Sequence, residues 1–225
     1  MNRCAMEVPV LSAHAKRFFL CLIVCGLFAS AKAYSQTVTS QGSSTVLLNN
    51  RIAHVDITLH NHVELHIITT KQKSFKISES QYGEYQQAIL LNSLQSNDTL
   101  YINDPKNPAF NYPNGKLSAH KVVDGKATVY IPQGKTVFIT AASADVTLTG
   151  DYSNITVNLQ NGKCALLDTT GNFQIVTVYA PIYVKTNHTA ITAQSKTGAV
   201  TGTATAANVL FTGKIESING SITIE

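Results

Sequence analysis

A repeat with a period of about 18 residues constrains the fold of this chain more than any other feature of its sequence. Similar short segments follow a turn, and their equivalent positions are Asp145, Lys163, Pro181, Ala199 and Ser221. The first three steps between these positions are equal, and the last is slightly longer. Equal steps of this kind are typical of an architecture in which one structural unit stacks on copies of itself.

The columns of this frame agree in chemistry. The first apolar column is Val146, Cys164, Ile182, Val200 and Ile222, and a second strand begins with Ile155, Phe173, Ile191 and Val209. A corner column holds only small residues, namely Ala144, Gly162, Ala180, Gly198 and Gly220. Each period therefore contains two short strands and a tight corner, and stacked copies form parallel sheets around an apolar interior. The sequence predicts an all-β fold, a parallel β-solenoid with coils of about 18 residues, and an antiparallel β-sandwich is the alternative.

The chain before the repeat is also rich in strand patterns, but it is less regular. Residues 36–103 alternate between apolar and polar positions, and residues 104–116 carry three prolines. We expect residues 34–124 to form irregular β-strands that cap the N-terminal end of the stack, because the exposed edge of a solenoid needs covering. Residues 125–225 would then be the regular coils, and residues 34–225 one continuous domain.

Residues 1–33 have the pattern of a signal peptide. Lys16 and Arg17 precede an apolar run at residues 18–31, and a small-x-small cleavage site ends at Ala33. The apolar run is shorter than a membrane-spanning helix requires. We therefore expect cleavage before Tyr34, no transmembrane anchor in the mature chain, and export to the periplasm, the cell surface or the extracellular medium.

The charge of the chain bears on its partners, and its cysteine content bears on disulfide bonds. Residues 1–33 hold four of the 17 Lys and Arg and one of the 13 acids, so the mature balance is 13 − 12, or +1. Without a basic run, no nucleic-acid partner is expected. Cys164 is the one cysteine beyond residue 33, so no internal disulfide is expected either. Because it falls in an inward column, Cys164 is predicted to be a small core residue.

One segment concentrates side chains that can bind metals. Its polar face carries His54, Asp56, His60, His62, Glu64 and His66. A hairpin with its tip at Asn61 would bring imidazoles and carboxylates within metal-ligand range. If the two strands instead turn a corner of a coil, these groups spread apart. A solvated polar strand face is the default, so we expect no metal and keep these six residues only as candidate ligands.

Carboxylate pairs are candidates for glycoside chemistry, which needs two acids on either side of a sugar. Asp151 and Asp168 occupy neighbouring corners of the predicted coils. They have no Arg or aromatic platform nearby, and corner aspartates commonly accept hydrogen bonds from turn backbone. The sequence therefore predicts no catalytic residue and no cofactor.

Several motifs together resemble a known family. They are HVDITLHNHVELHI at residues 54–67, DTLYI at residues 98–102, ATVYIPQG at residues 127–134 and the Asn-Gly corners of the coils. These motifs look like the bacterial "putative adhesin" β-solenoid family, including the autotransporter adhesin head GIN domain, which is common in Bacteroidetes. The resemblance covers nearly all of the mature chain. It implies a secreted or envelope-displayed, right-handed β-solenoid without established catalytic residues.

These observations favour a non-enzymatic, adhesin-like module of the cell envelope or the secreted fraction that contacts a surface protein or a glycan. The alternatives are a carbohydrate-active β-helix protein and a periplasmic scaffold without a ligand. The last segment, residues 217–225, ends in a strand that nothing follows. An unpaired strand edge readily accepts another strand. We therefore also expect an end-to-end homodimer through Ile222 and Ile224.

Overall fold

The structure, a computed structural model, describes residues 43–44, 51–82, 91–104, 124–203 and 208–225. The chain separates into two units, Met1–Thr37 and Val38–Glu225, and every described residue belongs to the second. The expected signal peptide at residues 1–33 lies outside the described residues, as does most of the proline-rich segment. Among the described residues, no helix is long and apolar enough to cross a membrane.

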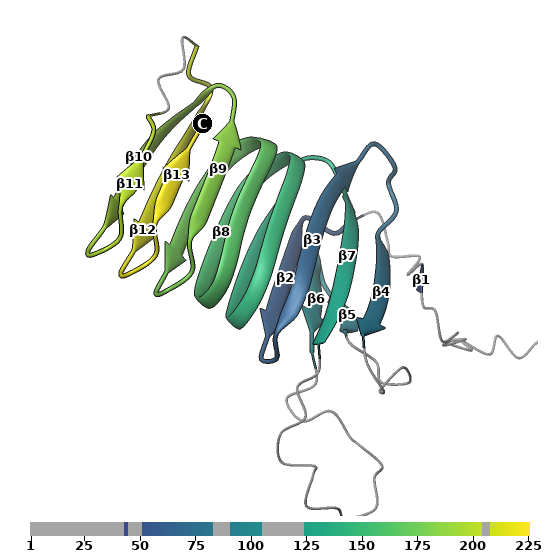
Figure 1. The fold of residues 1–225 in the computed structure, drawn as a ribbon. Helices are drawn as coiled ribbons and strands as arrows, with labels where there is room; N and C mark the ends of the chain where they lie inside the picture. The colour runs from purple at the N-terminus through teal and green to yellow at the C-terminus, as the bar shows by residue number, and fades with distance from the viewer. Residues whose placement is uncertain (1–42, 45–50, 83–90, 105–123, 204–207) are drawn as a thin grey trace, which may run out of the picture. The chain divides into compact units, whose positions relative to one another are not determined.

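The described residues form β-strands (Figure 1). The strands are β1 (Ser43–Ser44), β2 (His54–Leu59), β3 (Val63–Thr70), β4 (Lys76–Tyr82), β5 (Asn92–Ser96), β6 (Thr99–Asn103), β7 (Asp124–Pro132), β8 (Lys135–Thr177), β9 (Ile182–Thr186), β10 (Thr189–Ser195), β11 (Val200–Thr201), β12 (Phe211–Ser217) and β13 (Ile222–Ile224). The prediction of an all-β fold is therefore confirmed.

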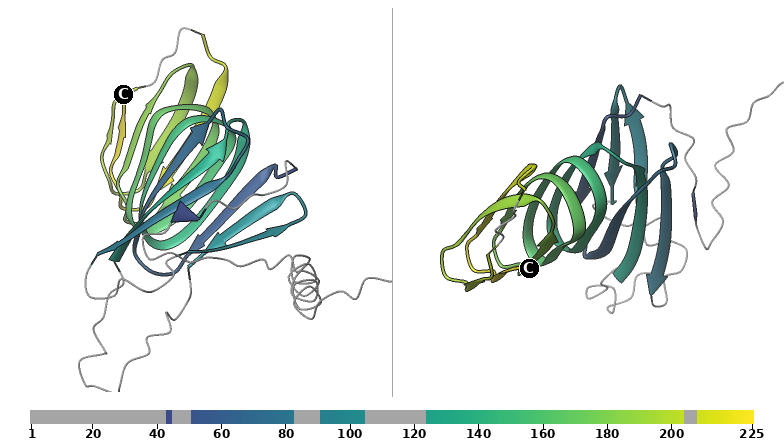
Figure 2. Two further views of the ribbon diagram at one scale, coloured as in Figure 1. Left: turned by 90° about the vertical axis from the view of Figure 1, so that its right-hand side faces the viewer. Right: turned by 90° about the horizontal axis from the view of Figure 1, so that it is seen from above.

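The strands belong to one 13-stranded mixed sheet. Views along other directions show that this sheet curls on itself (Figure 2). Strands β1 and β4, β4 and β7, and β5 and β6 pair antiparallel, whereas the other pairs between different strands are parallel. The wholly parallel arrangement that the sequence predicted is thus not what the described residues form, because antiparallel pairs occur both at β1, β4 and β7 and at β5 and β6.

The register between β8 and β9 agrees with the 18-residue frame of the sequence. Cys164 pairs with Ile182 and Leu166 pairs with Val184, which is the predicted step. All four side chains are buried, so the apolar positions of the frame face the core at this step. The expected second-strand column is also inward at Ile155 and Phe173. Burial of these alternate positions is the main contribution to the stability of such a sheet.

The small corner column has a steric cause. A Cβ atom added to Gly162 would lie 1.9 Å from the carbonyl oxygen of Ala144, and one added to Gly220 would lie 2.1 Å from that of Ala180. The backbone of Gly162 also has a φ of +102°, which residues with a side chain rarely adopt. Successive corners therefore approach each other so closely that Gly162 and Gly220 have no room for even the methyl group of alanine.

The order of the strands at the C-terminal end differs from the prediction. Ile222 pairs with Ile182 on one side and with Val200 on the other. Likewise, β12 lies between β8 and β10. The segment expected to be the last coil is therefore an inner one, and its edge is not free. Among the described strands, β10 and β11 are outermost at this end, so an end-to-end homodimer cannot use the edge at Ile222 that the sequence suggested.

The inner position, between β9 and β11, is occupied by the more apolar copy of the repeat. Ile222 and Ile224 are 0% and 6% exposed, whereas their counterpart Val200 in β11 is 43% exposed. The counterpart of Ile224 in the frame is Gly202, which has no side chain to bury. Covering two isoleucines on both sides removes more apolar surface from water than covering Val200 and Gly202 would.

The order of strands in the sheet also differs from their order in the sequence for β2 and β3. The first coil of the chain, β2 and β3, pairs with β6 and β7 on one side. On the other side it pairs with the first part of β8. The pairs β2 and β3, and β12 and β13, therefore both lie inside the sheet, with other strands on both sides of them.

Cys164 lies in the core, as predicted, and is 1% exposed. Burial raises the pKa of its thiol to about 12. Because the thiolate is the reactive form, the thiol should be inert in the folded protein. In the chain from Tyr34 onward, we expect dithionitrobenzoate at pH 8 to label no thiol until urea unfolds the protein, when one equivalent reacts. Rapid labelling of the native protein would contradict this placement of Cys164.

Candidate functional site

The predicted histidine-rich segment turns a corner and does not form a hairpin. Strand β2 pairs with β6 and with residues 136–141 of β8, whereas β3 pairs with β7 and with residues 144–149 of β8. The two strands do not pair with each other. The six candidate ligands are therefore divided between two faces and the corner that joins them. Among the described residues, no three His, Cys, Asp or Glu side chains are placed to hold a metal ion.

The corner between β2 and β3 is held by the carboxylate of Asp104, which is 3% exposed. Its Oδ1 accepts a hydrogen bond from the backbone N–H of His60 at 2.8 Å and contacts the His60 Nδ1 at 2.9 Å. Its Oδ2 accepts from the backbone N–H of Asn61 at 2.6 Å and from the Asn61 side-chain amide at 2.7 Å. His60 is thus engaged in fixing the corner, and Asp104 is a structural residue that the sequence analysis did not single out.

Replacing Asp104 with alanine is expected to lower the free energy of unfolding by about 3 kcal/mol, because two backbone N–H groups lose a charged acceptor. Urea unfolding measures this loss. The matched control is Asp98→Ala, since the Asp98 carboxylate is exposed and contacts only neighbouring polar side chains. That variant should lose no more than about 1 kcal/mol. Equal losses for the two aspartates would contradict the proposed role of the corner.

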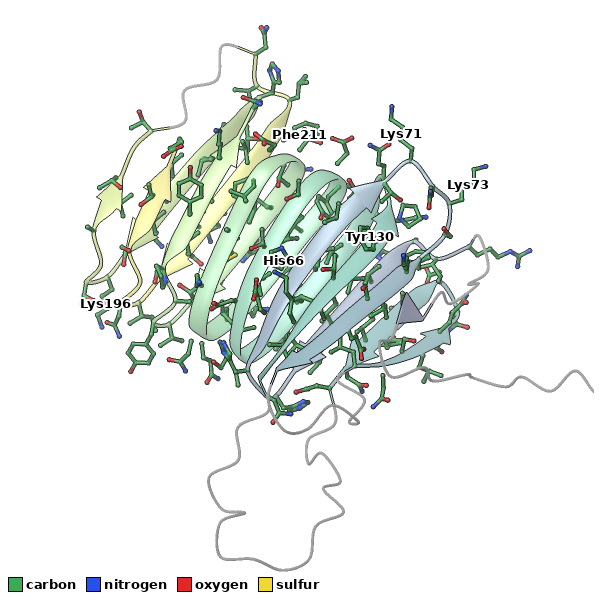
Figure 3. The ribbon with its side chains drawn as sticks, turned by 45° about the vertical axis from the view of Figure 1, so that its right-hand side comes forward. His66, Lys71, Lys73, Tyr130, Lys196 and Phe211 are labelled. Carbon is green, nitrogen blue, oxygen red and sulfur yellow. The ribbon has the colours of Figure 1, made fainter. Side chains whose placement is uncertain are left out.

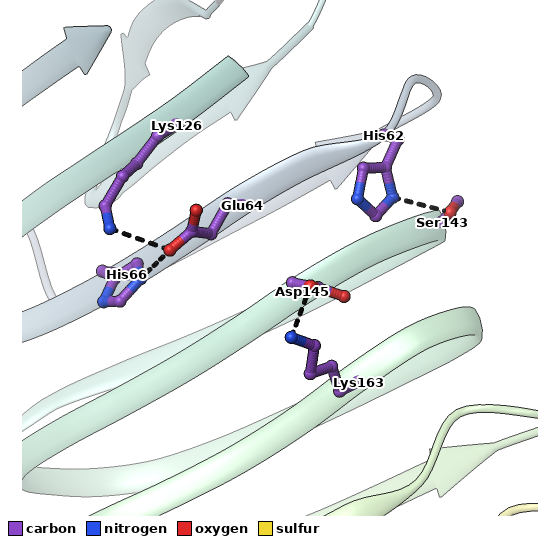
Figure 4. A network of polar contacts seen from close by, with 7 residues as sticks. All are labelled: His62, Glu64, His66, Lys126, Ser143, Asp145 and Lys163. Carbon is purple, nitrogen blue, oxygen red and sulfur yellow. Dashed lines mark hydrogen bonds and ion pairs between the residues drawn. The ribbon is translucent and has the colours of Figure 1, made fainter. Parts of the chain in front are cut away.

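The outer surface of β3 and its neighbours, which we call the β3 face, carries paired charges (Figure 4). Glu64 accepts hydrogen bonds at 2.8 Å from both Lys126 Nζ and His66 Nε2. One strand further along, Lys163 pairs with Asp145 at 2.9 Å. The hydrogen bonds from Lys126 and then His66 lower the pKa of Glu64, and Asp145 raises the pKa of Lys163. The acids of this face are therefore already neutralised by neighbours.

Two further side chains of the β3 face have partners of their own. His62 contacts Ser143 Oγ through Nδ1 at 2.9 Å (Figure 4). Tyr130, which lies on the same side of the sheet as His66 (Figure 3), has the ammonium of Lys76 5.9 Å from its ring centroid. This arrangement is a cation–π contact within the protein. The β3 face thus satisfies its charged and aromatic groups internally.

The outer surface of β5, β6, β2 and the first turn of β8, which we call the β2 face, is different. Its central row runs Leu94, Tyr101, Asp56 and Phe138 on four adjacent strands. Tyr101 is 43% exposed and Phe138 is 41% exposed, and Asp56 lies between them. In the part of the chain that the structure describes, Asp56 has no hydrogen-bond or ion-pair partner.

His54 lies two positions before Asp56 on the same face. Its Nε2 is 3.7 Å from a carboxylate oxygen of Asp98, and its ring centroid is 6.4 Å from that of Phe138. Its Nδ1 is buried without a hydrogen-bond partner among the described residues. The imidazole therefore contributes to the aromatic character of this face, and its Nε2 faces Asp98.

A groove of about 320 Å³ adjoins the β2 face. It crosses the corners of four neighbouring strand segments, and its lining is Thr58, Leu59, His60, Thr140, Ala141, Ala142, Asn158, Leu159, Gln160, Val176, Thr177 and Val178. Ala141 and Ala142 leave space between His60 and Gln160, which are exposed at the rim. Thr58 and Thr140 belong to both surfaces, so the groove continues into the β2 face.

The aspartates considered for glycoside chemistry occupy other corners. Asp151 accepts hydrogen bonds from Gln133 Nε2 and from Thr170 Oγ1, each at 2.7 Å. Asp168 is exposed and has a left-handed φ of +48°. Asp151 therefore joins neighbouring corners, as turn aspartates commonly do.

Comparison with known proteins adds a likeness of fold. No protein-family model matches the chain, and no curated protein matches its sequence. A "putative cell adhesion protein" from Clostridium sporogenes is 13% identical, with a TM-score of 0.59 over 81% of this chain and 97% of that one. At this identity the similarity shows the fold alone.

Two other solved structures have lower scores. A "putative adhesin" from Bacteroides fragilis is 9% identical, with a TM-score of 0.25 over 82% of this chain and 96% of that one. A "putative lipid binding protein" from Parabacteroides distasonis is 11% identical, with a TM-score of 0.30 over the same shares. These scores are too low to carry an argument. The likeness of fold therefore rests on the structure from Clostridium sporogenes.

Proposed function

We propose that this chain is a non-enzymatic, adhesin-like module of the cell envelope or the secreted fraction, and that its β2 face and the adjoining groove contact a surface protein or a glycan. The observation that carries this proposal is the row of Tyr101, Asp56 and Phe138, which are two exposed rings around an acid without a partner among the described residues. Exposed aromatic side chains of this kind are typical of contact surfaces.

The architecture favours the same function. We propose that the repeated parallel ladders form a right-handed β-solenoid, in which side chains at equivalent positions line up across the strands. Such a stack presents an extended and rigid surface for contact with a partner. The likeness of fold to a protein named as a cell adhesion protein supports this view.

A binding assay tests the proposed contact surface. Beads coated with the purified protein should adhere to cultured cells and to mucin-coated or matrix-coated surfaces, and the double variant Tyr101→Ala/Phe138→Ala should abolish most of this adhesion. The matched control is Tyr179→Ala, because Tyr179 is 60% exposed and lies outside the β2 face. Beads that never adhere, or adhesion that the double variant leaves intact, would refute the proposal.

Export is part of the proposal and has its own test. Fractionated cells should contain the protein in the envelope or the medium, and N-terminal sequencing should begin at or near Tyr34. An intact N-terminus at Met1 or Met6 in the cellular fraction would contradict export.

The absence of catalysis is also part of the proposal. Incubation with neutral and anionic glycans should yield no new reducing or unsaturated ends. Turnover that Asp151→Asn abolishes would instead establish the alternative, a carbohydrate-active β-helix protein.

A further inference from the structure

We propose that the β2 face recognises a positively charged side chain, an arginine or a lysine of a partner polypeptide, through Tyr101, Asp56 and Phe138. This inference rests on the proposed function and specifies the chemistry of its partner. We call these three residues the cation site.

Several other acids that project from strand faces have a lysine beside them. Glu64 is 2.8 Å from Lys126, Asp145 is 2.9 Å from Lys163, and Glu216 is 3.0 Å from Lys214. Asp56 occupies the same kind of position in β2, but its cross-strand neighbours on both sides are aromatic. A partly buried carboxylate loses hydration, and it regains the lost free energy when a cation pairs with it. The cation that this protein supplies to those acids is missing at Asp56 in the described part of the chain.

The two rings complete a site of the right chemistry. The exposed large aromatic side chains of the described residues are Tyr101, Phe138 and Tyr179, and two of the three are the neighbours of Asp56. Adjacent strands are about 4.8 Å apart, so a cation at the carboxylate of Asp56 lies within reach of both rings. Attraction between a cation and the face of an aromatic ring acts over about 6 Å from its centroid. The acid and the rings therefore favour the same ligand group.

The net charge of the chain gives no general attraction for cations, so binding of a basic ligand depends on the groups near the cation site. From Tyr34 onward the charge balance is 13 − 12, or +1, so the protein as a whole does not attract cations. The other charged groups near the cation site are engaged, since His54 faces Asp98 and the ammonium of Lys135 donates to the carbonyl oxygen of Ile52. Asp56 is therefore the acid between the two rings with which a basic ligand would pair.

Leu94 favours a polypeptide over a sugar as the carrier of this charge. Leu94 is 69% exposed and lies directly beside Tyr101 in the same row. An exposed aliphatic side chain next to an aromatic ring suits an apolar residue that neighbours the basic one in an extended peptide.

The test compares two peptides that differ only in charge. A capped peptide with one arginine next to a leucine should bind the full-length protein in isothermal calorimetry at about 0.15 M salt, a condition chosen to screen diffuse attraction. Its counterpart with citrulline, which has the shape of arginine without the charge, should bind about tenfold more weakly. Asp56→Asn should cause a similar loss, and Tyr101→Ala and Phe138→Ala losses of about threefold each.

Matched controls use residues outside the β2 face. Asp168→Asn and Tyr179→Ala should leave the affinity of the arginine peptide unchanged. Equal affinity for arginine and citrulline in the unaltered protein would overturn the inference, and so would binding that Asp56→Asn leaves intact. Preferential binding of neutral or amino sugars at the same residues would also overturn it.

The bead assay separates failure of this inference from failure of the proposed function. Adhesion that requires Tyr101 and Phe138, together with indifference to peptide charge, would retain the contact surface and remove its preference for cations. Discrimination between arginine and citrulline without any adhesion would support the cation site and refute the adhesin-like function.

Discussion

Replacing Ile222 with lysine should lower the free energy of unfolding by about 5 kcal/mol, because an ammonium would be placed in a core position that is covered on both sides. Ile222 is 0% exposed and pairs with β9 and with β11. The matched change Val200→Lys should cost less than about 1 kcal/mol, since Val200 lies in the outer strand and its side chain is partly in water. Urea unfolding of the two variants measures the difference.

This pair of variants distinguishes two orders of the same repeat. If the coils were stacked in the order of the sequence, Val200 would be the inner residue and Ile222 the outer one. A larger loss for Val200→Lys than for Ile222→Lys would therefore refute the interleaved order. Thr223→Lys is a further control, because Thr223 alternates with the buried isoleucines and points outward.

Truncation of Phe173 to alanine should lower the free energy of unfolding by about 3–5 kcal/mol. Phe173 is 5% exposed, and its ring occupies the space beside Gly213. A Cβ atom added to Gly213 would lie 2.2 Å from that ring, so the glycine provides the room that the aromatic side chain fills. Loss of the ring leaves a cavity that neither the glycine nor the neighbouring strands can close.

Gln174→Ala is the matched control, since Gln174 is exposed and follows Phe173 in the same strand. Its loss should be below about 0.5 kcal/mol in urea unfolding. Equal and small losses for both variants would mean that the inward register of this strand is wrong.

The internal register of the coils could be predicted because the sequence repeats it. The step from Cys164 to Ile182 places equivalent side chains opposite each other, and the small corner residues match the close backbone approach. The order of neighbours could not be predicted in the same way. Both Val200 and Ile222 fit the place beside Ile182, and periodicity alone does not decide between them.

The candidate site could be predicted only in part from the sequence. Asp56 is one of six polar residues in the histidine-rich segment, but the significance of its position depends on Tyr101 and Phe138, which lie far along the chain from it. The pairing of β2 with β6 and β8 lies outside the 18-residue frame, so no repeat indicates it. The pattern of the histidine-rich segment is compatible with a hairpin and with a corner, and the packing of β2 and β3 against other strands decides for the corner.

The inner position of β12 and β13 has a consequence for how the protein is made. Among the described strands, β10 pairs only with β12 and β11 only with β13, so the coil at residues 189–201 has no other strand on which to dock. A nascent chain that leaves the ribosome from the N-terminus onward cannot complete this end of the sheet coil by coil. Residues 189–201 therefore stay undocked, with apolar side chains such as Ile191 uncovered, until β12 and β13 have been synthesised. A chain that ends before Phe211 would thus lack β12 and β13, and its β10 and β11 would have no strand to pair with.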